Sequence, residues 1–276
     1  MRQQPMRCVP MLERGVVNIH SMNSYNATIR IIYTLWLRQL KRYWRSPARI
    51  VGSLGQPLLF LIALGYGLGA VFQQAGQGNF ISFLAPGIMS MAILFTSIFS
   101  GIEIIWDKQF GFLKETLVAP VSRWTIMFGR TLGGATVALI QGIIVFLLAL
   151  AIGFRPINPW MIVPALFFML LIALLFTALG TAIASRLNDM QGFQLIMNFV
   201  VMPIFFLSGA IFPLDKVPVA LADVVKLNPL SYGIDAVRGL LIGNPVFPLT
   251  VDATVLIAVA AFLMALGAWL FSGIQA

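Results

Sequence analysis

Long apolar stretches with almost no charged residues dominate this chain, and they constrain its fold more than any other feature. A helix needs about 20 predominantly apolar residues to cross the hydrocarbon of a bilayer. Charged residues make up only 10% of the chain, whereas soluble domains carry about a quarter. We therefore expect an all-α polytopic membrane protein with six transmembrane helices. The predicted spans are residues 50–72, 81–105, 131–153, 160–184, 192–207 and 249–274.

Two segments precede the first span. Residues 1–27 mix polar residues and prolines without a period, so we expect a flexible tail. Residues 28–49 show a helical period in which an apolar stripe lies opposite a basic face. This pattern is typical of a helix in the membrane interface, and given the spans that follow it is less typical of a nucleic-acid-binding helix. Ser46-Pro47 is expected to mark the bend into the span. The basic face includes Arg38, Lys41, Arg42 and Arg45.

A short charged stretch, residues 106–120, separates the second and third spans. At helical spacing its apolar residues share one face and its charged residues another, which predicts a surface helix that contacts a separate soluble partner. Pro120 is expected to end this helix and Ser122 to cap the next one. Residues 121–130 are interpreted as a second surface segment. The two faces are Trp106, Phe110, Leu113 and Leu117, and Asp107, Lys108, Lys114 and Glu115.

Residues 208–248 are too polar and too rich in proline to span the bilayer. Residues 218–227 and 230–242 are each long enough for a short helix, and Asn228-Pro229 separates them. We expect both helices to dip into the membrane interface from one side.

The basic residues predict the orientation, because lysine and arginine concentrate in cytoplasmic loops. Fourteen of the 18 lysines and arginines lie in the N-terminal region and in the loops on the same side as both termini. The other four lie on the opposite side. We therefore expect both termini and residues 106–120 to be cytoplasmic, with residues 208–248 outside.

The sequence offers little for chemistry. It has no phosphate-binding loop and no Gly-Lys pair, so it cannot hydrolyse ATP by a P-loop mechanism. Ion-coupled carriers usually place ionisable groups at mid-membrane, but here Glu103 is the main candidate, and it is interpreted as a helix-end residue near water or an arginine. Cys8 and His20 give no metal cluster, and we expect no catalytic residue and no metal site. Together these features predict a permease driven by a separate ATPase.

Three motifs in order, together with the layout of the spans, give the chain a family resemblance. They lie at residues 114–130, 206–213 and 228–239, and the first begins Lys114-Glu115-Thr116-Leu117. On these motifs the chain resembles the permease subunits of type-2 ABC exporters, such as the daunorubicin-resistance and nodulation-factor export permeases. The resemblance covers most of residues 28–274.

The resemblance implies an interfacial connecting helix, a cytoplasmic coupling helix and short external re-entrant helices within a domain over residues 50–276. It implies two permease copies, as a homodimer, and two ABC ATPase subunits. ATP and magnesium would bind on the ATPases, and this chain would carry no cofactor. The expected location is the bacterial inner membrane, with membrane lipids but no nucleic acid as partners. Its coupling residues would be Phe110, Leu113, Lys114, Glu115, Leu117 and Pro120.

The first and fifth spans are expected to shift about a central path when the ATPases close. Phe205, Phe206 and Phe212 are candidates for an apolar outer gate, although packing against lipid or core explains them equally well. The expected cargo is an amphiphile, either drug-like, lipid, glycolipid or polysaccharide. The alternatives are an ion-coupled secondary transporter or channel, and a membrane scaffold.

Overall fold

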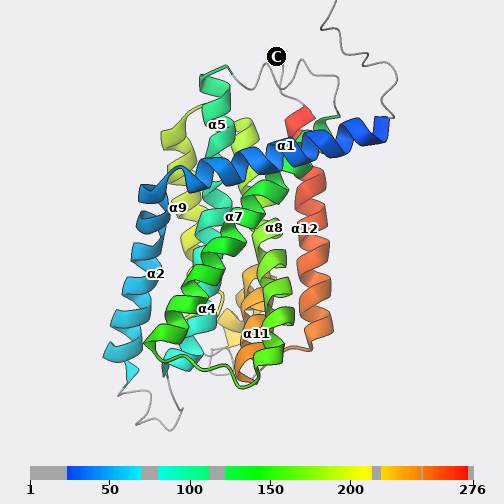
Figure 1. The fold of residues 1–276 in the computed structure, drawn as a ribbon. Coiled ribbons are helices and arrows are strands. Elements are labelled where there is room, and N and C mark those ends of the chain that lie inside the picture. Colours follow the sequence, from blue (N-terminus) through cyan, green and yellow to red (C-terminus); the bar gives the residue numbers. More distant parts are fainter. Residues whose placement is uncertain (1–23, 70–79, 112–121, 213–218, 244, 273–276) are drawn as a thin grey trace, which may run out of the picture.

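The computed structural model is a helical bundle over the residues it describes, which are 24–69, 80–111, 122–212, 219–243 and 245–272 (Figure 1). Two ends of the bundle can be distinguished: helix α1 lies across one end, and helix α11 packs at the other. The elements are α1 (Ser24–Trp44), α2 (Pro47–Gly67), α4 (Phe80–Phe99), α5 (Ile102–Gln109), α7 (Arg123–Ile152), η2 (Pro159–Met161), α8 (Ile162–Arg186), α9 (Met190–Phe206), α10 (Val219–Leu227), α11 (Pro229–Ile242) and α12 (Leu249–Ser272).

Five helical segments among the described residues are long and apolar enough to cross a membrane, which agrees with a polytopic membrane protein. They are Pro47–Gly67, Phe80–Gln109, Arg123–Ile152, Pro159–Arg186 and Leu249–Phe271. The predicted fifth span corresponds to α9, an apolar helix of 17 residues that runs between the α1 end and the α11 end (Figure 1). At 1.5 Å per residue α9 is about 26 Å long, close to the shortest helix that spans a bilayer.

Helix α4 forms the centre of the bundle and packs against α2, α7, α8 and α11. In the most apolar part of the segment that contains α4, 78% of the residues are buried, whereas in the corresponding part of α2 only 17% are buried. Glycines allow the central helices to approach closely: a Cβ atom on Gly180 of α8 would lie 2.5 Å from the carbonyl oxygen of Ile98. The core therefore depends on backbone contact as well as on apolar side chains.

Helix α1 lies across the bundle and packs mainly on α7. Gly129 and Gly133 of α7 lie in this contact, and α1 packs directly against their backbone. A Cβ atom added to Gly129 would lie 3.2 Å from Ile32 Cα, and one added to Gly133 would lie 2.6 Å from Gln39 Cγ. The predicted bend is confirmed, because α1 ends at Trp44 and α2 begins at Pro47 with Ser46 as its N-cap.

The predicted second span is divided. Helix α4 ends at Phe99, and α5 begins at Ile102 after a turn at Ser100 and Gly101. A single helix over residues 106–120 is also wrong, because α5 ends at Gln109 and Gly111 has φ of 79°, a left-handed conformation that favours glycine. Residues 112–121 lie outside the described residues.

The sequence predicts a surface segment at residues 121–130 that is separate from the third span, but its described part is not separate. These residues form the first turns of α7, which continues without a break to Ile152. The predicted cap is confirmed: the Ser122 hydroxyl accepts a hydrogen bond of 3.2 Å from the Thr125 backbone N–H. Arg130 is buried instead of solvated, because a carboxylate from another helix pairs with it.

The two short helices predicted after the fifth span are α10 and α11. Helix α11 packs against α4, α8 and α12, so it enters the bundle from the end opposite α1 (Figure 1).

Candidate functional site

A cluster of charged side chains joins α1, α2, α5 and α7 at the α1 end of the bundle. Glu103, in the first turn of α5, accepts hydrogen bonds of 3.0 Å from Arg42 Nη1 and from Arg49 Nη1. The interpretation of Glu103 as a helix-end residue near an arginine is therefore confirmed. Its carboxylate connects α5 to the corner between α1 and α2.

Asp107 is the second acidic residue of the cluster, one helical turn after Glu103. Its carboxylate pairs with Arg130 Nη2 at 2.6 Å, with Arg38, and with Arg42 Nη2 at 3.6 Å. The side chains of Asp107 and Arg130 are only 3% and 2% exposed. Asp107 is therefore a buried link between α5, α1 and α7, and not part of a solvated helix face as its sequence spacing predicted.

The end of α5 is also attached to α8. Lys108 Nζ donates to the carbonyl oxygens of Ser185 at 2.6 Å, Leu187 at 2.9 Å and Ala184 at 3.4 Å. A cation at these carbonyls is favourable because the last C=O groups of a helix lack intrahelical partners and carry partial negative charge. Helix α5 is thus attached to its neighbours on both sides.

Large aromatic side chains remain exposed at the same end of the bundle. Trp106, Phe110 and Trp124 are all exposed at the α1 end, and Phe110 is 69% exposed. Of the predicted coupling residues, only Phe110 falls within the described part of the chain, directly after α5. Leu113, Lys114, Glu115, Leu117 and Pro120 lie outside it.

The predicted basic face of α1 divides into two pairs. Lys41 and Arg45 are exposed, whereas Arg38 and Arg42 are half-buried against Asp107 and Glu103. On the same helix Tyr43 is buried and its hydroxyl donates to Gln141 Oε1 at 2.7 Å. Burial raises the pKa of the Tyr43 phenol, and the nearby positive charge of Arg49 only partly offsets this.

The candidate gate residues lie toward the other end of the bundle. Phe205 is buried and contacts the exposed ring of Phe206 edge-on, with centroids 5.4 Å apart. Phe212 is half-buried.

The motif around α11 holds that end of the bundle together. Asn228 caps α11 and also donates to the carbonyl of Ile204 at 2.6 Å. Arg238 donates to the Gly209 carbonyl at 2.9 Å and lies 4.1 Å from the centre of the Phe83 ring. Burial lowers the pKa of Arg238 to about 10, although Asp235 opposes the shift. Asp235 accepts backbone hydrogen bonds from Val246 and Phe247, which tie α11 to the start of α12.

Sequence reasoning missed the charged cluster, although a signal for it was present. Arg38 and Arg42 are four residues apart, and so are Glu103 and Asp107. Two helices with opposite charges at the same spacing can form a ladder of ion pairs. The described residues contain no group of three or more histidine, cysteine, aspartate or glutamate side chains that could hold a metal ion.

Comparison with known proteins gives consistent matches. The family model described as "ABC-2 type transporter" matches residues 30–242. Nodulation protein J of Rhizobium leguminosarum bv. trifolii is 29% identical over 208 residues, which cover 74% of this chain and 78% of that protein. The putative transport permease ycf38 of Pyropia yezoensis is 30% identical over 248 residues, which cover 86% of this chain and 81% of that protein.

Proposed function

We propose that this chain forms the membrane path of an exporter driven by a separate ATPase subunit, because it belongs to the ABC-2 type transporter family. The family match and the similarity to a putative transport permease support a transport subunit. The finer proposal is that it moves an amphiphile, either drug-like, lipid, glycolipid or polysaccharide, out of the cytoplasm or the inner leaflet. ATP and magnesium would be bound by the partner.

The observation that carries the proposal is the attachment of α5. Asp107 ties α5 to α1 and α7, and Lys108 ties it to α8. A push on the end of α5 is therefore transmitted to three other helices as a rigid-body movement, which is the usual way a packed bundle responds. The exposed aromatic rings of Trp106, Phe110 and Trp124 suit a contact with a partner at this end.

The proposed orientation places the α1 end in the cytoplasm of a bacterial inner membrane, with both termini inside. The excess of basic residues on this side supports it. Single cysteines in a Cys8→Ser background test it, because Asn188 lies at the α1 end and Ile157 at the α11 end. A membrane-impermeant maleimide added to whole cells should label Ile157→Cys and not Asn188→Cys. The reverse pattern would exclude the orientation.

The coupling role is tested by Phe110→Ala, with Phe262→Ala on α12 as the matched control, since both rings are about two-thirds exposed. Truncating a central interface aromatic typically costs about 2 kcal/mol, a loss of roughly thirtyfold in affinity. We expect Phe110→Ala to weaken binding of the ATPase and to uncouple hydrolysis from export, while Phe262→Ala changes neither. Equal behaviour of the two variants would contradict the docking role.

One observation keeps the ion-coupled alternative open. Asp252 on α12 is fully buried, and neither of its carboxylate oxygens has a hydrogen-bond partner among the described residues. Ionisable groups inside the membrane often serve ion pathways. The alternative predicts uphill transport by the isolated chain in liposomes with a proton gradient and no ATP, and loss of that transport in Asp252→Asn. The exporter proposal predicts no transport without the ATPase.

A further inference from the structure

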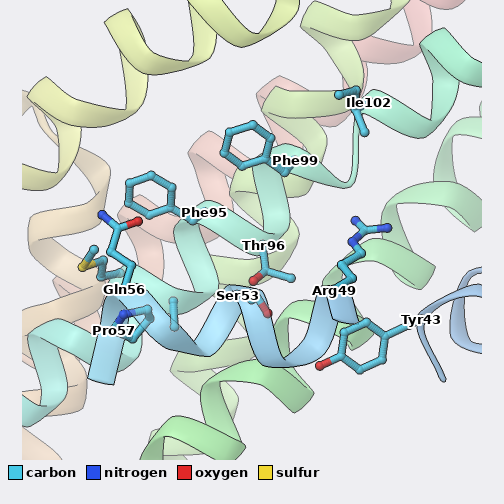
Figure 2. A pocket seen from close by; sticks show the side chains of 12 residues that line it. Tyr43, Arg49, Ser53, Gln56, Pro57, Phe95, Thr96, Phe99 and Ile102 are labelled. Atoms are coloured by element: carbon cyan, nitrogen blue, oxygen red, sulfur yellow. The ribbon is translucent and has the colours of Figure 1, made fainter. Parts of the chain in front are cut away.

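A cavity of about 450 Å³ lies between α2 and α4, beside the corner where α1 turns into α2 (Figure 2). Its volume falls within the range of pockets that hold small molecules, about 300–1,000 Å³. Its lining does not include the exposed rings of Trp106 and Phe110 at the end of α5, nor the buried Asp107–Arg130 pair.

The cavity has one amphipathic wall and one mainly apolar wall. On α2, Arg49, Gly52, Ser53 and Gln56 line it at spacings of three and four residues, so they share one helix face. The opposite wall belongs to α4 and includes Phe95 and Phe99, whose stacked rings have centroids 6.4 Å apart. A polar stripe within a predicted membrane span is not needed for packing against the apolar face of α4.

The charged cluster next to the cavity is not balanced. Four arginines (Arg38, Arg42, Arg49 and Arg130) contact only two carboxylates, Glu103 and Asp107, so these six residues together carry an excess of two positive charges. Arg49 is the arginine that lines the cavity, and its side chain is 35% exposed. The Tyr43 hydroxyl is already bonded to Gln141. Arg49 uses Nη1 for Glu103 at 3.0 Å, but a guanidinium has five N–H donors, so Arg49 is the main recognition group at this end.

The length and direction of the cavity match a lipid chain. From Arg49 to Pro57 the wall follows eight residues of α2, which is about 12 Å along the helix. Arg49 lies at the start of α2, beside interfacial helix α1, and the apolar part of the cavity runs from there toward the middle of the span. Arginine side chains near span ends commonly place their charge at headgroup level.

We propose that this cavity binds an anionic membrane lipid, with the phosphate at Arg49 and one acyl chain between α2 and the rings of Phe95 and Phe99. The charge excess selects an anionic headgroup, and the aromatic wall of α4 accepts the chain. A zwitterionic lipid would fill the same space without the charge preference. A side chain from a second copy of the protein is the competing occupant. This inference concerns binding and does not depend on ATP or on transport.

The test uses the full chain in vesicles that contain photoreactive phosphatidylglycerol or photoreactive phosphatidylcholine, each with a diazirine on the acyl chain. Cross-linked peptides are mapped by mass spectrometry. One cationic side chain at the surface favours an anionic lipid by about 1 kcal/mol, roughly fivefold. We therefore expect label on the cavity faces of α2 and α4, about fivefold stronger with phosphatidylglycerol.

Two glycines on α2 provide a matched pair of variants. An added Cβ would meet no atom within 4 Å at either Gly52 or Gly55, but only Gly52 lines the cavity. Gly52→Leu should remove the cavity label, and Gly55→Leu should keep it. Arg49→Gln should lower the lipid preference to about one, while Arg49→Lys should retain it.

Three results would overturn the proposal. These are equal labelling by the two lipids, labelling that Gly52→Leu does not change, and absence of label from the cavity because a second copy fills it. Circular dichroism and thermal melting of each variant in detergent confirm that the helices are intact before labelling is compared.

Discussion

At the scale of single residues, Arg130 is a charged group whose burial needs an explanation. Its side chain is almost fully buried in α7, and of its donors Nη2 contacts Asp107 while Nε and Nη1 have no hydrogen-bond partner within the described residues. Desolvating a guanidinium group is costly, and an opposite charge in direct contact offsets most of that cost. Asp107 is therefore the residue on which the burial of Arg130 depends.

Asp107→Asn should strongly destabilise the protein, because it leaves Arg130 buried without a negative partner. Breaking a buried ion pair typically costs about 3–5 kcal/mol. Asp223→Asn is the control: Asp223 pairs with Lys226 at 3.3 Å, but the aspartate is 74% exposed, and exposed pairs contribute at most about 1 kcal/mol. Unfolding in detergent measures both variants. Similar midpoints for the two would contradict the assigned role, and a double variant with Arg130→Gln should recover part of the loss.

At the scale of elements, the close approach of α4 and α8 explains why the second span is divided. A Cβ on Gly101 would collide with the carbonyl oxygen of Gly180, and one on Gly180 would lie 2.5 Å from that of Ile98. The two backbones meet where α4 ends and α5 begins. Small residues at such crossings allow membrane helices to gain van der Waals contact that larger side chains prevent. The turn at Ser100 thus aims α5 while α4 stays packed in the core.

Gly180→Ala should lower stability even though alanine is the better helix former. The added methyl would overlap backbone atoms, which cannot move aside as a flexible side chain can, and overpacking of this kind costs about 1–3 kcal/mol. Gly55→Ala on α2 adds the same methyl into open space and should be neutral or slightly stabilising. Thermal unfolding of the purified variants compares them. A neutral Gly180→Ala would mean that α4 and α8 are not in backbone contact.

At the scale of the whole molecule, the features that could be predicted from the sequence are those that local residue patterns determine. The apolar runs, the bend at Ser46-Pro47, the Ser122 cap and the two short helices after α9 all follow from composition and spacing within a few residues. The errors came from partners distant in sequence. Local pattern alone predicts Arg130 at the surface because its carboxylate partner lies 23 residues away, and it predicts Asp107 on a solvated face for the same reason. The end of α5 near Gly111 is a backbone property that periodicity does not reveal.

Helix α9 carries exposed aromatic residues on the surface of the bundle. Phe199 is 86% exposed, and α9 contacts the rest of the bundle mainly through α4 and α5. Helix α2 is also little buried for a predicted span. Since aromatic residues are enriched where two protein surfaces meet, we expect α9 to face a second copy. In a Cys8→Ser background, Phe199→Cys should cross-link into a dimer in native membranes. Phe262→Cys, which is 65% exposed on α12, should stay monomeric because α12, unlike α9, already packs against three helices of its own chain, α7, α8 and α11. Cross-linking of both variants, or of neither, would remove the argument for a pair of permease chains joined through α9.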